Sequence, residues 1–292
     1  MTSRMTPEKT PKVRNNMNKD MEKILKHLRL WGLLERWDEV IAEARKKRFS
    51  PERLLQHVLE SEYRSKSENA RILRRKRAHI PDPLEIETYP FQRQPKLDRK
   101  KIMSLYDGLD YMEKNQNIIL LGPTGCGKTG LATSFLLHAI DQGYRGYFTS
   151  FANLVAELYA SMADRSEDKV IGKYVAYDCL VIDEVGYIEV EPTQVGLFFT
   201  LMQKRHKNKP TLLTSNLGFS EWSSFLKNKH LTAALIDRLT ENSHVINMKN
   251  CKTLRGKLDD QVKSEDSEPS DDAASEPPED AGPEPSEDAE SE

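Results

Sequence analysis

Eight consecutive residues have the composition and spacing of a loop that binds the phosphates of a nucleoside triphosphate. They fit the pattern GxxxxGK(S/T) and comprise Gly122, Pro123, Thr124, Gly125, Cys126, Gly127, Lys128 and Thr129. Glycines let such a backbone curl until successive N–H groups point at phosphate oxygens. Lys128 is placed to reach the β and γ phosphates, and the Thr129 hydroxyl to bind Mg²⁺. The loop therefore predicts binding of a nucleoside triphosphate with magnesium.

The residues on either side of the loop supply the context that this pattern needs. An apolar run at 117–121 precedes the loop and is typical of a strand, and residues 131–140 follow it as a helix. A strand, a glycine loop and a helix in this order form a phosphate site. A chance match with both flanks correct is rare, so we interpret the loop as functional.

Two adjacent carboxylates end a second apolar run. Asp183 and Glu184 follow residues 179–182. Neighbouring side chains on a strand point in opposite directions, so the two acids can have different roles. Asp183 is a candidate for the Mg²⁺ shell, and Glu184 for polarising an attacking water. The pair favours water over a small-molecule hydroxyl as the phosphoryl acceptor.

Two further polar residues end or interrupt apolar patterns. Asn216 follows the run 211–214, where an amide can hold the attacking water or the γ phosphate, although Ser-Asn-Leu-Gly is also a good turn sequence. Arg238 stands in an otherwise apolar helix pattern beside Asp237. It can pair with that aspartate on a solvated edge, or reach the γ phosphate of a neighbouring subunit as an arginine finger.

The elements that would position these side chains alternate between strand and helix from about residue 97. This order predicts a mainly parallel sheet that is covered by helices on both faces. The ligand is then expected at the carboxyl ends of the strands. Strands are predicted near 117–121, 145–149, 179–183, 210–214 and 244–248.

A separate helical region precedes this pattern. Apolar residues between 21 and 48 recur at spacings of three and four, which predicts an amphipathic helix that is broken near Gly32. Ser50 and Pro51 are a cap and a first helical residue, so a second helix is expected from there to about Ala78. Five parts follow from these patterns: a disordered basic arm at 1–20, a helical DNA-binding domain at 21–80, a linker at 81–96, a nucleotide domain at 97–258 and a disordered acidic tail at 264–292.

The end of the second predicted helix is strongly basic. Between residues 64 and 77 the only acid is Glu68. A charge run on a helix is commonly a solvated face, but a phosphate backbone is the natural counterpart of this density of positive charge. The predicted DNA contacts are Arg71, Arg74, Arg75, Lys76 and Arg77.

The charge of the chain is divided unevenly along its length. The formal net charge is -2, but residues 264–292 hold 13 of the 46 acidic side chains and no basic ones. The remaining 33 acidic side chains face 44 basic ones, so residues 1–263 carry a net charge of +11. The net positive charge of residues 1–263 is typical of a protein that binds a polyanionic partner, or simply of a well-solvated surface.

The cysteines and the lengths of the apolar stretches indicate the cellular compartment in which the protein is found. Cys126, Cys179 and Cys251 lack the spacing of a metal site, and the first lies inside the phosphate loop, where an oxidised thiol would be disruptive. No apolar stretch approaches the ~20 residues needed to span a bilayer. We therefore expect a cytoplasmic protein with no membrane partner.

These motifs in this order resemble those of the IstB-like ATPases. These are helper proteins of insertion-sequence transposition, in the DnaC and IstB initiator branch of the AAA+ ATPases. The resemblance runs from about Lys26 to Arg255 and depends on the combination of motifs. Besides the candidates above, it includes Leu28-Arg29-Leu30, Glu60 to Arg77, Tyr89-Pro90-Phe91, Val181 to Tyr187, Thr214-Ser215-Asn216, Trp222 and Asp237-Arg238-Leu239.

The resemblance implies an α/β fold, with an AAA+ P-loop core whose parallel sheet is flanked by helices and a small all-helical domain in front. Lys128 and Thr129 become Walker A residues, and Asp183 and Glu184 Walker B residues. Asn216 becomes sensor 1, and Arg238 the arginine finger. ATP and Mg²⁺ are the implied cofactors. Duplex DNA, a transposase and further copies of the chain, joined through the ATP site, are the implied partners.

The chain also departs from the family pattern. Gly130 stands where the family commonly has histidine, and Thr253-Leu254-Arg255 where it commonly has Ser-Tyr-Arg. Three other functions remain open at this point: a DnaC-like helicase loader of the same fold, a small-molecule P-loop kinase, and a nucleotide-gated binding module without turnover. The dense basic helix favours a protein that contacts DNA directly.

Overall fold

The computed structural model describes residues 17–255. Most of the predicted basic arm at 1–20 and the whole predicted acidic tail at 264–292 lie outside the described residues, as do residues 256–258 of the predicted nucleotide domain. Within 17–255, no helix is long and apolar enough to cross a membrane.

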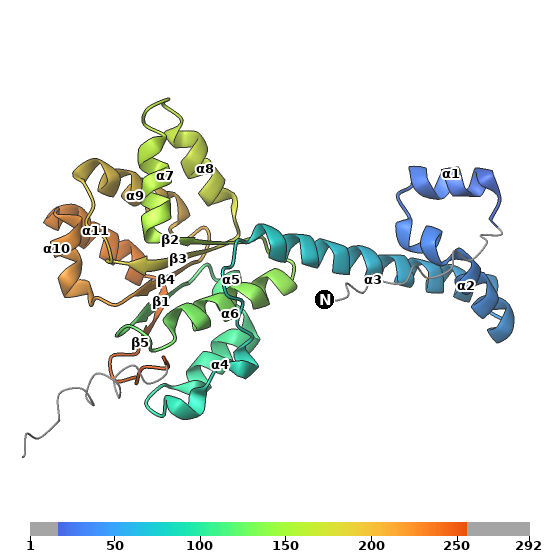
Figure 1. Ribbon diagram of the computed structural model, residues 1–292, viewed down its shortest axis with the longest axis horizontal. Helices are drawn as coiled ribbons and strands as arrows, with labels where there is room; N and C mark the ends of the chain where they lie inside the picture. The colour runs from blue at the N-terminus through green and yellow to red at the C-terminus, as the bar shows by residue number, and fades with distance from the viewer. Residues whose placement is uncertain (1–16, 256–292) are drawn as a thin grey trace, which may run out of the picture. The chain divides into compact units, whose positions relative to one another are not determined.

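The nucleotide domain is built on a parallel sheet of five strands in the order β2-β3-β4-β1-β5 (Figure 1). This confirms the predicted α/β class, and each strand lies within two residues of its predicted range. The strands are β1 (Asn117–Leu121), β2 (Gly146–Ser150), β3 (Cys179–Val185), β4 (Thr211–Ser215) and β5 (Ser243–Asn247).

Helices cover both faces of the sheet, and each face has its own apolar core. Ile118 and Leu120 of β1 belong to one core, and Ile119 and Leu121 to the other, as the two-residue period of a strand requires. The first core includes side chains of α4 and α6, and the second includes side chains of α7, α9 and α11. The helices of this domain are α4 (Arg99–Gly108), α5 (Asp110–Glu113), α6 (Lys128–Asp141), α7 (Phe151–Ala160), α8 (Glu167–Ala176), α9 (Pro192–Arg205), α10 (Trp222–Leu226) and α11 (Lys229–Thr240), with the short 3-10 turn η3 (Phe219–Glu221).

Three helices precede this domain: α1 (Lys19–His27), α2 (Trp31–Lys47) and α3 (Pro51–Arg77). The break predicted near Gly32 is present, but it lies slightly earlier in the chain. The chain turns at 28–30, where Arg29 adopts a left-handed backbone with φ 55°. Gly32 lies instead in the first turn of α2, where a Cβ would come within 3.0 Å of a Glu62 carboxylate oxygen. The glycine therefore permits close helix packing.

Glu62 links α2 to α3. The N-cap position of α2 has no side-chain hydrogen bond of its own. Glu62 of α3 supplies one, because its Oε2 accepts a 2.9 Å hydrogen bond from the backbone N–H of Leu33. Its side chain is buried, and a carboxylate also suits the positive end of a helix dipole. The predicted Ser50 cap of α3 is confirmed, with its Oγ accepting from the Arg53 N–H.

The segment predicted as a linker, 81–96, is irregular but packs against the nucleotide domain. It contains two 3-10 turns, η1 (Ile86–Thr88) and η2 (Phe91–Arg93), and buries Ile86, Tyr89 and Gln94. Immediately before it, the carbonyl of Ala78 accepts a 2.8 Å hydrogen bond from the N–H of Phe148 in β2. The end of α3 is thus fixed to the edge strand of the sheet.

Candidate active site

The phosphate loop joins β1 to α6 with the backbone that its glycines predict. Gly125 and Gly127 have φ of 80° and 94°, in the left-handed region that favours glycine. Lys128 begins α6, and its buried Nζ donates hydrogen bonds to the carbonyls of Gly122 (2.8 Å) and Pro123 (2.9 Å). The lysine charge is therefore held within the curl of the loop, where triphosphate oxygens are expected to bind.

Residues far from the loop in sequence hold it from outside. Tyr89 Oη and Gln94 Nε2 both donate to the carbonyl of Cys126, at 3.1 and 3.3 Å, and the N–H of Leu254 donates to Gly125 O at 2.7 Å. A Cβ on Gly127 would lie 2.8 Å from Tyr89 Oη. This close approach gives Gly127 a second reason to be glycine. Sequence reasoning missed Gln94, since no local pattern marks it.

The departure at Gly130 also has a packing reason. A Cβ at this position would lie 2.8 Å from a methyl group of Leu84. The carbonyl of Leu84 accepts a 2.7 Å hydrogen bond from Ser134 Oγ, one helical turn further along α6. The first turn of α6 is therefore covered by the segment that follows α3, and a larger side chain at position 130 would require the Leu84 side chain to move.

The structure brings the two predicted metal ligands together. Thr129 Oγ1 lies 3.0 Å from both carboxylate oxygens of Asp183, although 54 residues separate them in the chain. Asp183 is 5% exposed and is the last residue of the continuous buried run 179–183 in β3. A hydroxyl and a carboxylate are oxygen ligands of the kind that Mg²⁺ takes. Thr129 and Asp183 would hold a magnesium ion, which would supply positive charge beside the phosphates.

Glu184 is displaced from the regular strand. The register between β3 and β4 shifts between Ile182 and Val185, and Glu184 has φ 62°. A non-glycine residue in the left-handed region costs roughly 1–2 kcal/mol. Its side chain is exposed, whereas those of its neighbours Asp183 and Val185 are buried. A strained bulge that re-aims a carboxylate is common beside active sites.

Thr214 connects the two acids, and sequence reasoning did not single it out as a site residue. Its hydroxyl donates to Asp183 Oδ1 and accepts a 2.9 Å hydrogen bond from the backbone N–H of Glu184. Thr214 is 1% exposed. One hydroxyl therefore orients the candidate metal ligand and satisfies the backbone of the bulge. The sequence Thr-Ser-Asn at the end of a strand does not indicate which of the three residues binds Asp183 and the Glu184 backbone.

We expect Thr214→Val to lower the ATPase rate by about 10- to 100-fold and to raise the Mg²⁺ concentration for half-maximal rate, because outer-shell partners of a metal ligand have effects of this size. Thr214→Ser retains the hydroxyl and should restore both values. A magnesium titration of the ATPase rate measures this. An unchanged magnesium dependence in Thr214→Val would reduce Thr214 to a structural role.

Asn216 follows β4 at the same edge of the sheet. Within the described part of the chain, its Oδ1 is among the few buried side-chain oxygens that have no hydrogen-bond partner. A buried polar atom without a partner calls for a water or a ligand. Tyr187, which follows the bulge, forms a 2.9 Å hydrogen bond with Thr124 of the phosphate loop. The loops after β1, β3 and β4 thus converge on one place.

Arg238 does not lie with the residues of the phosphate loop, β3 and β4. It is in the last turn of α11, where its guanidinium stacks over Phe199 at 4.8 Å and donates to the carbonyl of Ala234. Within residues 17–255 no ion pair joins it to Asp237. The carbonyl of the next residue, Leu239, accepts a 3.1 Å hydrogen bond from Asn117, the first residue of β1. The backbone of Arg238 is therefore near the amino edge of the sheet. The phosphate loop follows the carboxyl end of β1, about 13 Å along the strand at its ~3.3 Å rise per residue.

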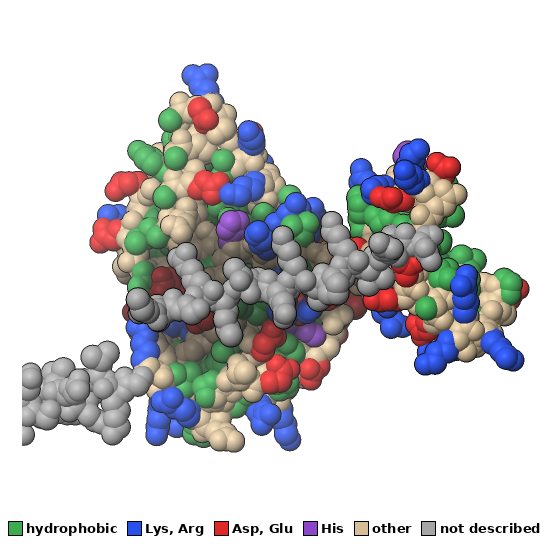
Figure 2. All heavy atoms as spheres, turned by 45° about the vertical axis from the view of Figure 1, so that its right-hand side comes forward, with side chains coloured by type: hydrophobic (Ala, Val, Ile, Leu, Met, Phe, Trp, Pro, Cys, Tyr) green, Lys and Arg blue, Asp and Glu red, His purple; other side chains and the backbone are tan. Residues whose placement is uncertain are grey.

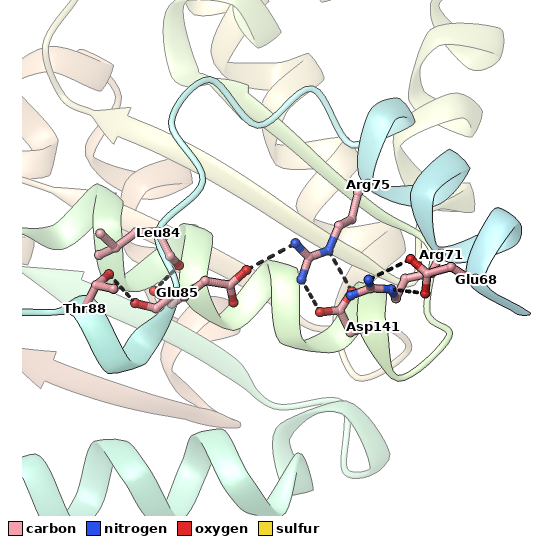
Figure 3. A network of polar contacts seen from close by, with 8 residues as sticks. Glu68, Arg71, Arg75, Leu84, Glu85, Thr88 and Asp141 are labelled. Atoms are coloured by element: carbon pink, nitrogen blue, oxygen red, sulfur yellow. Dashed lines mark hydrogen bonds and ion pairs between the residues drawn. The ribbon is translucent and has the colours of Figure 1, made fainter. Parts of the chain in front are cut away.

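Three of the five predicted DNA contacts have partners inside the chain. Figure 3 shows two of them, Arg71 and Arg75. Arg75 pairs with both oxygens of Asp141 and, at 3.1 Å, with Glu85, and these contacts raise its pKa. Arg71 binds Glu68 in a bidentate manner and lies 3.5 Å from Asp141. Arg74 donates to the carbonyl of Ile140. These arginines fasten α3 to the end of α6, a role that the charge run alone could not reveal.

Lys76 and Arg77 differ from these three. Both side chains are exposed, and within the described residues neither has a hydrogen bond or an ion pair. They are the members of the predicted set that remain available to a phosphate backbone.

The fold and the site together define a P-loop nucleotide-binding protein. AMPPCP-bound DnaA from Aquifex aeolicus has a similar fold, with a TM-score of 0.50 and 16% sequence identity over 64% of this chain and 56% of that chain. The likeness shows the fold, a parallel sheet flanked by helices with a helical region in front, as the sequence predicted.

Sequence comparison then gives the family. The profile of the family described as IstB-like ATP binding protein matches residues 23–260. The ATP-binding protein of insertion sequence IS5376 from Geobacillus stearothermophilus is 32% identical over 222 residues, which cover 76% of this chain and 88% of the relative. That of IS21 from Pseudomonas aeruginosa is 30% identical over 230 residues, covering 79% and 86%. The chain belongs to the IstB-like ATP-binding family.

Proposed function

We propose that this protein is an ATP hydrolase that assembles on duplex DNA and assists the transposase of an insertion sequence. Membership of the IstB-like family supports ATP binding, and the names of the relatives place them in insertion sequences. The observation that carries the proposal of hydrolysis is the cluster of Thr129, Asp183, Thr214 and Glu184, joined by hydrogen bonds at the carboxyl edge of the sheet.

Each residue of this cluster has a distinct task in the proposed reaction. Lys128 and the backbone N–H groups of the loop bind the phosphates, and Thr129 with Asp183 holds Mg²⁺. The metal, when bound, neutralises charge that develops on the phosphate oxygens. Glu184, on its exposed bulge, accepts hydrogen bonds from the attacking water and orients it. The unpartnered Asn216 amide is a second ligand for that water or for the γ phosphate.

The position of Arg238 supports assembly of several copies. It lies at the sheet edge opposite its own phosphate loop, so it can complete an active site only in a neighbouring subunit. ATP would then hold the subunits together, since the nucleotide contacts both of them. Hydrolysis removes this link and releases the assembly from DNA.

ATPase assays with and without duplex DNA test the proposal as a whole. We expect steady turnover that duplex DNA stimulates in the absence of any helicase. A helicase loader would instead respond to its helicase, and a small-molecule kinase to a second substrate. Tight ATP binding with no turnover under any of these conditions would contradict the proposed hydrolase.

A second test concerns DNA contact by the end of α3. We expect Lys76→Gln with Arg77→Gln to weaken duplex binding and to reduce the slope of log affinity against log salt by roughly 0.9 for each lost phosphate contact. Basal ATP binding should stay unchanged. A matched control is Lys100→Gln with Lys101→Gln, two exposed lysines at the start of α4. Equal slope changes for both pairs would show that total charge, not this helix end, governs binding.

The variant Arg75→Gln is a useful comparison with the Lys76 and Arg77 variants, because Arg75 has partners inside the chain. It removes the partner of Asp141 and Glu85, so it is expected to loosen α3 from the nucleotide domain and to lower the melting temperature. Weaker DNA binding by this variant would therefore not by itself identify a DNA contact.

A further inference from the structure

The last turn of α11, which carries Arg238, has all of its terminal carbonyls paired. The last four carbonyls of a helix have no partner within it and need donors from elsewhere. In α11 each of the four accepts a hydrogen bond from a residue that follows the helix or belongs to another element. The pairs are the Glu241 N–H with Asp237 O (2.9 Å), His206 Nδ1 with Arg238 O (2.9 Å), Asn117 Nδ2 with Leu239 O (3.1 Å) and Ser243 Oγ with Thr240 O (3.2 Å).

Two of these donors come from elements that are distant in the chain. Asn117 begins β1, is 6% exposed, and also accepts a 2.9 Å hydrogen bond from the N–H of Thr211 at the start of β4. His206 directly follows α9, and its side chain is 19% exposed. The last turn of α11 is therefore fixed to the sheet by Asn117 and to the end of α9 by His206.

Both ring nitrogens of His206 face acceptors at the end of α11. Nδ1 lies 2.9 Å from the carbonyl oxygen of Arg238, and Nε2 lies 3.0 Å from a carboxylate oxygen of Glu241. A hydrogen bond from Lys207, together with the nearby His206, lowers the pKa of Glu241, so this carboxylate is ionised at neutral pH. A carbonyl and a carboxylate only accept hydrogen bonds, so the ring satisfies both when both of its nitrogens carry a proton.

Contacts, rather than charge, distinguish His206 from other polar residues of the surface. Charged side chains of both signs are spread over the face drawn in Figure 2, and an exposed charge by itself fixes little. The guanidinium of Arg238 stacks on Phe199, which lies in α9 two helical turns before His206 and so on the same side of that helix. The end of α9 thus contacts both the side chain and the backbone of Arg238.

We propose that His206 is a positioning residue for Arg238. It holds the last turn of α11 on α9, so that the guanidinium is presented to the nucleotide of the neighbouring subunit. This inference rests on the proposed role of Arg238 in its neighbour's site. A misplacement of about 1 Å in a catalytic group can cost roughly 10²-fold in rate. Loss of His206 should therefore lower turnover and leave ATP affinity unchanged.

Variants that keep one donor each test which bond of His206 matters. An Asn amide N–H replaces Nδ1, and a Gln amide N–H replaces Nε2. We expect His206→Ala and His206→Gln to lower kcat about 10- to 100-fold, and His206→Asn to stay within about 3-fold of the wild type. His230→Ala, at an exposed histidine in the first turn of α11, is the matched control. Wild-type kcat in His206→Ala, with Arg238→Ala inactive, would overturn the proposal.

Mixing of variants shows on which side of the subunit interface His206 acts. Copies with His206→Ala retain Glu184, and copies with Glu184→Gln retain His206 and Arg238, so mixed oligomers should recover activity. The double variant His206→Ala with Arg238→Ala should be no slower than Arg238→Ala alone, because the two residues act as one unit. If Glu184→Gln restores activity to Arg238→Ala but not to His206→Ala, the histidine acts in its own subunit and the proposal fails.

Hydrogen exchange of the nucleotide-free protein separates this inference from the proposed function. His206→Ala should speed exchange of the amides at 238–242 about 10-fold and leave α6 unchanged, because local opening depends on the contacts of each segment. His206→Asn should restore the slow exchange. Unchanged exchange in His206→Ala would overturn the positioning role whatever the ATPase rates. A wild-type protein without turnover would contradict the proposed hydrolase, and the exchange rates would still decide whether His206 fixes this turn.

Discussion

Lys128→Ala is expected to abolish ATP binding, whereas Glu184→Gln should keep binding and stop turnover. Lys128 brings a buried positive charge to the phosphates. Truncating one partner of a buried charge pair costs about 2–5 kcal/mol, or roughly 30-fold to several thousand-fold in affinity. Glu184 is exposed on its bulge and is needed only when water attacks. Losing a general base of this type lowers turnover by about 10² to 10⁴.

Thermal denaturation with and without Mg²⁺ and ATP separates the two effects. A ligand at a concentration 100 times its dissociation constant stabilises the native state by about 2.7 kcal/mol. Glu184→Gln should retain this shift and remain bound to DNA, and Lys128→Ala should lose it. Glu189→Gln is a suitable control, since Glu189 is an exposed acid five residues away that pairs with Lys227. Wild-type turnover by Glu184→Gln would refute its role as the base.

Arg238→Ala is expected to eliminate ATP hydrolysis while leaving ATP binding in place. Arginine fingers account for about 10³ to 10⁵ in rate in related phosphoryl transfers. The contact of Leu239 with the first residue of β1 puts Arg238 at the wrong edge of the sheet for its own nucleotide. The active site would then exist only between subunits, so the ATPase rate per subunit should rise with protein concentration.

Mixing two inactive variants gives the decisive measurement for Arg238. Arg238→Ala retains an intact Glu184, and Glu184→Gln retains an intact Arg238, so some interfaces in a mixed oligomer are complete. Recovery of activity on mixing would place the arginine in its neighbour's site. Continued inactivity in demonstrably mixed oligomers, with a wild-type rate independent of concentration, would show that it acts in its own subunit or only structurally. Arg238 also stacks on Phe199, so the melting temperature of Arg238→Ala should be checked against that of Arg238→Lys.

Much of the nucleotide domain is encoded by local patterns. Five apolar runs separated by helical segments predicted five parallel strands, because burial on both faces requires continuous apolar residues. The glycine loop could be recognised since its spacing is a direct consequence of how a backbone encloses phosphates. The family followed from the same motifs. Assigning Asn216 and Arg238 to their roles depended on that family resemblance and stays a prediction.

Other features depend on contacts between residues far apart in the chain. The basic run predicted five equivalent DNA contacts. Arg75 instead pairs with Asp141, 66 residues away in the sequence, and so holds α3 against α6. Thr214 gained its position between Asp183 and Glu184 only when β3 and β4 paired with a register shift. The pattern of residues 21–48 predicted a helix break near Gly32. The break is at 28–30, and Gly32 lies in the first turn of α2, where it packs closely against Glu62.

The sequence by itself thus determined the chemistry of the phosphate loop, the order of the strands along the chain and the amphipathic character of the N-terminal helices. These depend on residue type and on spacing within one element. The tertiary structure alone decided which charges are engaged, which residues of α3 contact α2 and α6, and near which edge of the sheet the backbone of Arg238 lies. Each of these features is set by contacts between elements that are distant in the sequence. The periodicity of apolar or charged residues predicts that one face of an element is buried or paired, but it does not identify the element that packs against that face.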